Sequence, residues 1–173
     1  MTMKNHAIVT ALSLLIAVLT PMTLEAQGQV RCETDEVGDP PRVVYQCAGG
    51  VILEAEAAAS LGILSAGSEG RPMDVEVSSD AVLIEITPGS GLFQIRTPHA
   101  IAAVRGTVYL VDVSGGSTSV FVSEGEVAVS RIDGSDTVIL KAGFGADVRP
   151  GEPFAAREWH QNRVTELLRR FGR

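Results

Sequence analysis

The chain has 173 residues, of which 45% are hydrophobic and 20% charged, and its formal net charge is −7. This length favours a single domain, and the composition is that of a globular protein and not of a disordered one. The negative charge argues against nucleic acid as a partner, because phosphate binding requires a basic face.

The first 26 residues have the three parts of a secretory signal peptide. Lys4 supplies a positive charge, residues 7–20 form an apolar core, and Ala26 is a small residue at which cleavage can occur. A spanning helix needs about 20 apolar residues, so cleavage is favoured over retention as an anchor. We therefore expect a periplasmic or secreted protein that has no membrane span after cleavage near Gln27.

The two cysteines, Cys32 and Cys47, enclose an acidic stretch. Export to an oxidising compartment favours a disulfide between them over a redox-active or metal-binding pair. The acidic residues lack the spacing of a calcium-binding loop, and we interpret them as a solvated loop. Residues 27–49 are therefore predicted to form a disulfide-closed N-terminal segment.

Residues 50–150 are predicted to form an all-β domain of short strands. Val and Ile recur there in short apolar runs with frequent alternation, which suits half-buried strands. Residues 57–64 fit either a helical turn or a further strand. The expected strands are residues 51–55, 73–77, 81–86, 92–95, 107–113, 118–122, 126–130, 137–141 and 146–148.

Glycines punctuate the second half of this domain at a regular interval. Those at positions 106, 115, 125, 134 and 143 are separated by nine or ten residues. The spacing leaves room for one strand and a tight turn but for no crossover helix, so neighbouring strands should be antiparallel or wound in a coil. The fold class is therefore a single β-domain, either sandwich-like or β-solenoid-like.

After Pro150 the pattern becomes helical, and residues 151–173 are predicted to form a C-terminal amphipathic helix. Apolar side chains recur with helical spacing from position 164 to position 171, and Pro153 suits a helix start. We expect the helix to cover an open edge of the β-structure, with its arginines facing outward. The alternative is a partner-docking helix, whose candidate contact residues are Trp159, Arg163, Arg169 and Arg170.

Residues 97–113, TPHAIAAVRGTVYLVDV, combine apolar packing with unusual interruptions. Pro98 cannot donate to a strand ladder, so it marks a strand edge or a bend. Gly106 permits a bend or a close backbone approach. Arg105 is expected beside the core, with its guanidinium paired to a nearby carboxylate or to turn carbonyls. Apolar residues fall on both faces of residues 108–113, which predicts a strand covered on both sides.

This stretch, followed by TSVFVSEGEVAVS and VILKAGFGADV, resembles the FecR domain. The pattern of that family is Thr-Pro, a small apolar run, Val-Arg-Gly-Thr, a strand, a Val-x-Val-x-x-Gly-x-Val hairpin and a closing Leu-x-x-Gly. The resemblance extends from about residue 92 to residue 148, and more loosely back to residue 50. It implies an extracytoplasmic all-β domain. The residues that match the motif, which we interpret as determining the fold, are Thr97, Pro98, Val104, Arg105, Gly106 and Thr107.

Members that gave the FecR family its name regulate iron uptake. Their periplasmic part senses an outer-membrane receptor, and a membrane helix joins it to a cytoplasmic segment that acts on a sigma factor. We expect this chain to depart from that plan, because it shows neither an internal membrane helix nor a cytoplasmic segment. What the resemblance implies is therefore the extracytoplasmic domain, and not direct control of a sigma factor.

The motifs of common catalytic and metal sites are absent from the sequence. It has no zinc-binding spacing, no G-x-S-x-G and no phosphate-binding loop, and we interpret His99 as hydrogen-bonded within a turn. We therefore expect no enzymatic activity, no cofactor and no metal. The favoured function is contact with an envelope protein in signalling or assembly. The alternative is a module that binds a cell-wall or surface polysaccharide, which the scarcity of aromatic residues (5%) disfavours.

Overall fold

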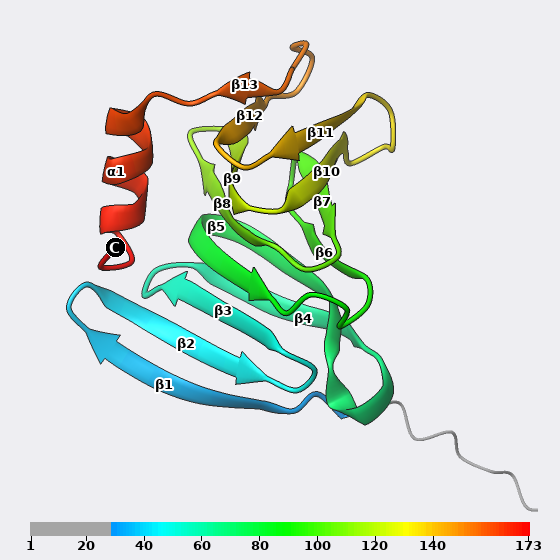
Figure 1. Cartoon of the computed structure of the whole chain (residues 1–173), viewed down its shortest axis with the longest axis vertical. Coiled ribbons are helices and arrows are strands. Elements are labelled where there is room, and N and C mark those ends of the chain that lie inside the picture. The colour runs from blue at the N-terminus through cyan, green and yellow to red at the C-terminus, as the bar shows by residue number, and fades with distance from the viewer. Residues whose placement is uncertain (1–28) are drawn as a thin grey trace, which may run out of the picture.

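The computed structural model describes residues 29–173, so the predicted signal peptide lies outside the described residues. The strands of this part of the chain form a 13-stranded sheet that folds over on itself into two facing halves (Figure 1). The strands are β1 (Cys32–Gly38), β2 (Pro41–Cys47), β3 (Val51–Glu56), β4 (Ser60–Ala66), β5 (Pro72–Ile86), β6 (Phe93–Arg96), β7 (Ala100–Val104), β8 (Val108–Ser114), β9 (Ser117–Glu124), β10 (Glu126–Arg131), β11 (Thr137–Lys141), β12 (Phe144–Val148) and β13 (Arg157–Glu158).

Strand β5 belongs to both halves of the sheet. Its first part pairs with β4 and β6, in the half that we call sheet B, and its second part pairs with β3 and β8, in sheet A. The change of sheet falls at Asp80, whose φ of 59° is left-handed. The runs predicted as two strands, residues 73–77 and 81–86, are therefore one strand with a bend.

The strand order follows from this arrangement. Sheet A has the order β1-β2-β3-β5-β8-β9-β12-β13, and sheet B has the order β4-β5-β6-β7-β10-β11. Neighbouring strands of the described chain are antiparallel except for β5 and β6, which pair in parallel over three residues. The prediction of an all-β domain is confirmed, and of the two architectures left open the facing sheets resemble a sandwich more than a solenoid.

One apolar core lies between sheets A and B. In β8, the side chains of Tyr109, Val111 and Val113 point into this core, whereas Leu110 is buried on the opposite face of the strand. The strand is therefore covered on both sides, as its sequence predicts. The other core strands also alternate, because successive side chains of a strand point to opposite faces. Their inward side chains, many of them valine, fill the rest of the core.

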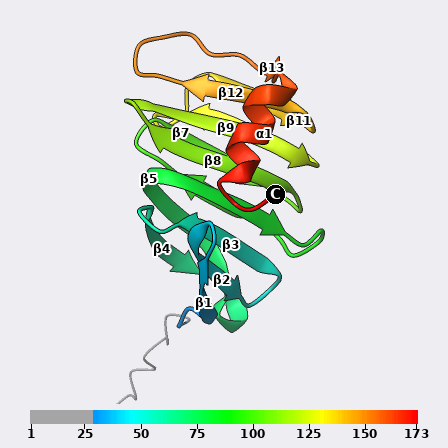
Figure 2. The same ribbon diagram turned by 90° about the vertical axis from the view of Figure 1, so that its left-hand side faces the viewer.

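Helix α1 (Gln161–Arg169) packs on the outer face of sheet A, where Figure 2 shows it lying across the strands. The expectation that it covers an open edge is wrong. The reason is that the outer face of β5, β8 and β9 itself carries apolar side chains that need cover. The second core that the helix and this face form contains Ala81, Leu83, Leu110, Phe121, Trp159, Val164, Leu167 and Phe171.

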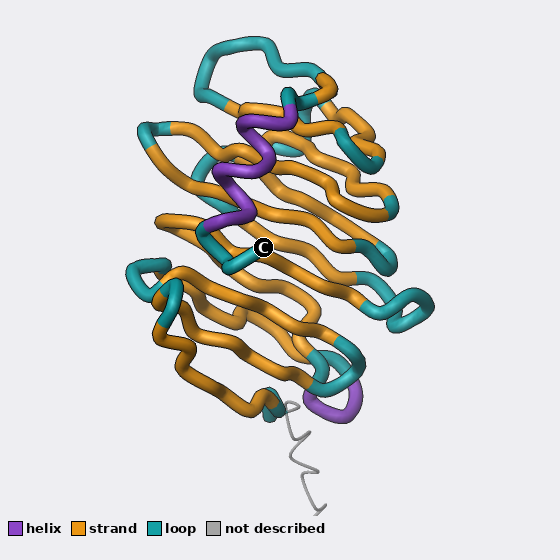
Figure 3. Tube along the Cα trace, turned by 60° about the vertical axis from the view of Figure 1, so that its left-hand side comes forward, coloured by secondary structure: helices purple, strands orange, loops and turns teal. Residues whose placement is uncertain are grey.

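The helix begins at Gln161 and not at Pro153, because the preceding residues are extended. Strand β13 pairs with β12, and Trp159 stacks on Phe121 with 5.3 Å between ring centroids. Trp159 fits there because Gly145 has no side chain: a Cβ at that position would lie 2.3 Å from the indole. In Figure 3 helix is confined to this C-terminal segment and to a short turn at Ser68–Gly70.

The N-terminal segment also differs from its prediction. The acidic stretch is not a loop, since β1 and β2 form a hairpin that extends sheet A from β3. Cys32 and Cys47 face each other at the end of this hairpin and form a disulfide. The acidic side chains lie on β1, the outermost strand, where charge protects an exposed edge from pairing with another chain.

We predict that the unfolded, unreduced protein contains no titratable thiol. Both of its cysteines are joined across β1 and β2, so a thiol reagent should react only after a reductant is added. Two thiols per chain in the absence of reductant would contradict the prediction. The Cys32→Ser, Cys47→Ser double variant is the control that fixes the background of the assay.

Candidate functional site

Thr97 organises the turn between β6 and β7. Its Oγ1 accepts the backbone N–H groups of His99 and Ala100, at 3.2 Å and 2.9 Å, and lies 2.8 Å from the Thr118 hydroxyl. The His99 Nδ1 is 3.1 Å from the same hydroxyl. Thr118 belongs to sheet A and Thr97 adjoins sheet B, so this buried hydrogen-bond cluster links the two sheets.

Gly106 lies in the connection between β7 and β8, where a side chain would not fit. Its φ is +82°, and a Cβ there would lie 2.5 Å from the Pro88 Cα. Gly125 is in the same situation, because its Cβ would meet the Thr107 methyl group at 2.6 Å. The two turns therefore pack closely through glycine, which is a structural requirement for both residues.

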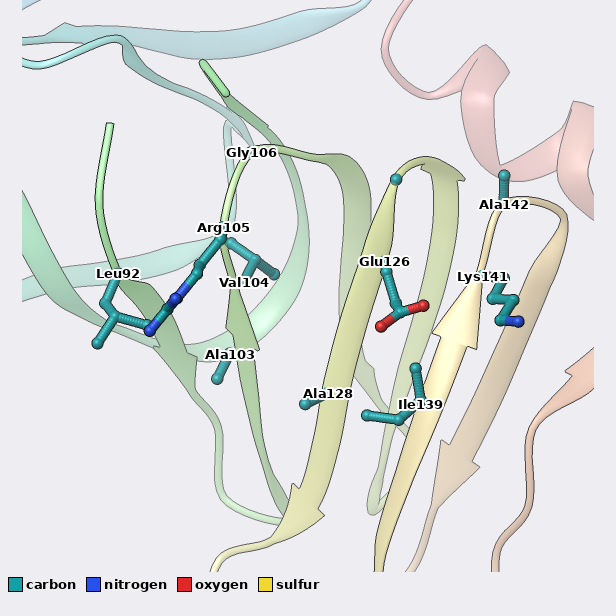
Figure 4. A pocket seen from close by; sticks show the side chains of 11 residues that line it. Leu92, Ala103, Val104, Arg105, Gly106, Glu126, Ala128, Ile139, Lys141 and Ala142 are labelled. Atoms are coloured by element: carbon teal, nitrogen blue, oxygen red, sulfur yellow. The ribbon is translucent and has the colours of Figure 1, made fainter. Parts of the chain in front are cut away.

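Arg105 is exposed, and the expectation that it lies beside the core with a paired guanidinium is wrong. Because Val104 points into the core, strand alternation places the Arg105 side chain on the outer face of sheet B (Figure 4). It forms no ion pair with another residue of the described chain. Arg105 is thus the one residue of the Val-Arg-Gly-Thr segment that is presented to solvent.

Arg105 lines a groove on the outer face of sheet B, with a volume of about 910 Å³. The floor is Ala103 of β7 and Ala128 of β10, which are partners in register. Leu92 and Ile139 stand on either side, 55% and 47% exposed (Figure 4). We call this site the sheet B groove; it is lined by Leu92, Ala103, Val104, Arg105, Gly106, Gly125, Glu126, Ala128, Ile139, Lys141 and Ala142.

The local sequence explains why the groove is hollow. Val127 and Val129 of β10, like Ala102 and Val104 of β7, point into the core, so the alternate positions face outward. Two of those outward positions, Ala103 and its register partner Ala128, hold alanine, which leaves the middle of the two central strands without large side chains. The result is a shallow apolar channel between taller neighbours.

The charged residues of the sheet B groove form one row at its end. Glu126 and Lys141 are register partners on β10 and β11, and Arg105 follows the end of β7 at the same level. No ion pair joins the three side chains in the described structure. The row therefore carries a local excess of one positive charge on a chain of net charge −7.

The apolar surface continues beyond the sheet B groove toward β5. A second hollow of about 390 Å³ shares Leu92 and Ala103 with the first and adds Met73, which is 41% exposed. Contiguous exposed apolar surface of this kind marks interaction sites in soluble proteins. Alternation with small outward residues is the only sequence feature that could have indicated it.

The candidate docking residues of the C-terminal segment occupy a different position from that expected. Trp159 is only 9% exposed, and Arg163 stacks on its ring at 3.4 Å while binding Asp147 at 2.9 Å. Arg170 binds Glu56 at 2.7 Å and Asp112 at 3.0 Å. The outward orientation expected for the arginines is therefore wrong for Arg163 and Arg170.

Arg169 is exposed on the far side of the helix and has no ion pair in the described structure. Arg173, just beyond the helix, binds Glu54 and Glu85. The helix is therefore held on sheet A by arginines 163, 170 and 173. That Trp159, Arg163, Arg169 and Arg170 dock a partner stays a prediction.

These contacts alter the acid–base properties of the groups that make them. Hydrogen bonds from Arg163 lower the pKa of Asp147. Burial of Glu56 acts to raise its pKa, but hydrogen bonds from Arg170 and from the Ala81 N–H, with the charge of Arg170, outweigh burial and lower it. Hydrogen bonding to Glu56 in turn raises the pKa of Arg170.

The part of the chain that the structure describes holds no cluster of three or more metal-ligating side chains. Tyr109 is fully buried between the sheets, where desolvation raises the pKa of its hydroxyl well above the usual value. A hydroxyl that neither solvent nor substrate reaches does not serve as a catalytic acid or base.

A family model described as FecR protein matches residues 34–128. This range includes β2, which is the second strand of the disulfide-closed hairpin, and the motif residues from Thr97 to Thr107. Two crystal structures of "a putative anti-sigma factor from Parabacteroides distasonis ATCC 8503" are similar to this chain at 15% sequence identity, with TM-scores of 0.50 and 0.49. Each match covers 82% of this chain but 62% of the solved one, and at 15% identity the match with a TM-score of 0.50 shows the fold alone. No curated protein matches the sequence.

We predict that Gly106→Ala destabilises the protein more than Gly134→Ala. Both glycines have positive φ, which costs an L-residue about 1–2 kcal/mol, but only at Gly106 would the new Cβ meet backbone atoms. Urea unfolding should therefore give a loss in the free energy of unfolding that is larger by about 1 kcal/mol or more at Gly106. Equal losses for the two glycine variants would contradict the packing argument.

Arg105→Ala should change the free energy of unfolding by less than about 0.5 kcal/mol, because the side chain is exposed.

We also predict that acid weakens the attachment of the helix through Glu56. The folded-state pKa of Glu56 is lowered, so its contribution is present above the ordinary pKa of 4.5 and is lost as the pH falls through the folded-state value. Arg170→Gln should reduce the free energy of unfolding at pH 7 by about 1–3 kcal/mol. This deficit should shrink as the pH is lowered below about 4, because protonated Glu56 no longer needs the cation.

The matched control for that series is Arg169→Gln, which removes an exposed arginine of the same helix. It should leave the free energy of unfolding within about 0.5 kcal/mol of the parent at every pH. A constant difference between Arg170→Gln and the parent from pH 7 to pH 3 would show that Glu56 does not titrate with the helix contact.

Proposed function

This chain belongs to the FecR protein family, and from that premise we propose that it is an exported, non-catalytic domain that acts through protein contacts in cell-envelope signalling or assembly. The observation that carries the proposal is the sheet B groove. It combines an apolar floor, exposed Leu92 and Ile139, and charged groups that have no partner within the described chain. That combination is typical of a surface that another protein covers.

Two further observations support an exported protein. The disulfide between Cys32 and Cys47 fits an oxidising compartment such as the periplasm. No helix of the described chain is long and apolar enough to cross a membrane. Both agree with the leader-like composition of the first 26 residues, which the structure does not describe.

The groove is a better candidate for partner binding than the helix. A partner that docked on Arg163 or Arg170 would compete with Asp147, Glu56 and Asp112 for the same guanidinium groups. The groove offers Arg105 and Lys141 without such competition. Its occupation would also bury apolar surface that is exposed in the isolated chain.

The polysaccharide-binding alternative has less support from the site. Sugar rings are commonly held by stacking on exposed aromatic side chains, and no aromatic residue lines the sheet B groove. Its floor is alanine and its polar groups lie at one end only. These features suit an apolar protein segment better than a polysaccharide, whose surface is rich in hydroxyl groups.

The proposal is tested with a photo-crosslinking amino acid placed at single positions in the protein produced by its native bacterium. Position 139 lies in the groove and position 169 lies on the exposed side of the helix. We expect irradiation to give a discrete protein adduct from position 139 and none from position 169. An adduct from position 169 alone would transfer the function to the helix, and the absence of adducts from both positions would contradict action through protein contacts.

A further inference from the structure

The shape of the sheet B groove restricts what can occupy it, and the inference below rests on the proposed protein-binding function. Strands β6, β7, β10 and β11 are neighbours in that order. The outer two are three strand spacings apart, or about 14 Å. Larger side chains stand on either side, at Leu92 just before β6 and at Ile139 of β11, while the floor between them is Ala103 and Ala128 (Figure 4). A helix with its side chains is about 10 Å across and fits between such walls.

The same chain shows how a helix binds the other sheet. On the outer face of sheet A, α1 buries its apolar side chains over Leu83, Leu110 and Phe121. Around this apolar centre, arginines of the helix segment bind carboxylates of the sheet, as Arg170 does with Glu56. The design is an apolar helical stripe bordered by ion pairs, with the cations on the helix.

In the sheet B groove the cations lie on the sheet, whereas on sheet A the sheet supplies the carboxylates and the helix the cations. Arg105 and Lys141 stand at its end without ion pairs in the described chain, and Glu126 is the one acid that lines it. A helix that used the same design here would carry carboxylates opposite these two cations. The α1 helix of a second copy is not available for this role, because its apolar side chains are already buried against sheet A.

The direction of the helix follows from its dipole. The C-terminal end of a helix carries partial negative charge, which nearby cations stabilise by about 0.3–1 kcal/mol. We propose that the sheet B groove binds an amphipathic helix of a partner protein, with carboxylates in its last turn against Arg105 and Lys141. The apolar stripe of that helix lies on Ala103 and Ala128, whose small side chains let the two backbones approach closely.

The experiment uses two synthetic amphipathic helical peptides of about 14 residues, long enough for some 21 Å of helix. They share an apolar stripe of leucine and alanine and an amidated C-terminus. One has two glutamates in its last turn, and the other has glutamine at the same positions. Binding to the isotope-labelled mature protein is followed by fluorescence anisotropy and by backbone amide chemical shifts.

The glutamate peptide is expected to bind about tenfold more tightly than the glutamine peptide, which corresponds to about 1.4 kcal/mol. Its addition should shift the amide signals of Ala103 and Ala128. In the Arg105→Gln, Lys141→Gln double variant the two peptides should bind alike. The matched control is Arg157→Gln, Arg169→Gln, which removes two exposed arginines away from the groove and should preserve the tenfold difference.

Other outcomes overturn the inference. Equal affinity of the two peptides for the parent protein, or no binding of either, excludes an acidic helix as the occupant. Shifts confined to the free edge of β11 indicate an added strand, and dimerisation through the groove in sedimentation identifies a second copy as the occupant. If position 139 still crosslinks to a protein in the cell, the proposed function stands and the inference about the helix alone fails.

Discussion

The fold depends on the passage of β5 from one sheet into the other. Because residues 72–79 pair in sheet B and residues 80–86 pair in sheet A, the two sheets must face each other and share one core. The central strands of each sheet then have one face turned inward, and their Val-rich alternation fills the space between the sheets. Binding surfaces are thereby restricted to the two outer faces and to the free edges.

The two outer faces meet this constraint differently. The outer side chains of β5, β8 and β9 include Leu83, Leu110 and Phe121, and leaving them in water would cost about 1.5–3 kcal/mol each. The chain covers them with α1 and holds it there by ion pairs. The alanine floor of sheet B exposes less apolar area per residue and can remain uncovered. The face without a helix of its own is therefore the face available to a partner.

Much of the fold could be predicted from the sequence because alternation and glycine turns are local features. The bend within β5 was missed because Ser78, Ser79 and Asp80 resemble a turn, and only the pairing of both halves shows one strand. The N-terminal hairpin was missed because its outer strand has acidic side chains and little apolar periodicity. The late start of the helix could not be predicted, since it depends on Trp159 filling the space at Gly145, which is distant in sequence.

The Val-Arg-Gly-Thr segment shows how far motif residues can differ in role. Gly106 is required by its positive φ and by contact with Pro88, and Val104 is buried in the core, so both serve the fold. Arg105 has no ion pair in the described chain, and strand alternation places its side chain on the outer face of sheet B, where it lines the groove. An exposed motif residue with no ion pair in the described chain lacks the core contacts that fix Val104 and Gly106. The alternation that buries Val104 in the core therefore places a cation where the exposed apolar surface of sheet B ends, which connects the architecture of the domain to the surface through which we propose it acts.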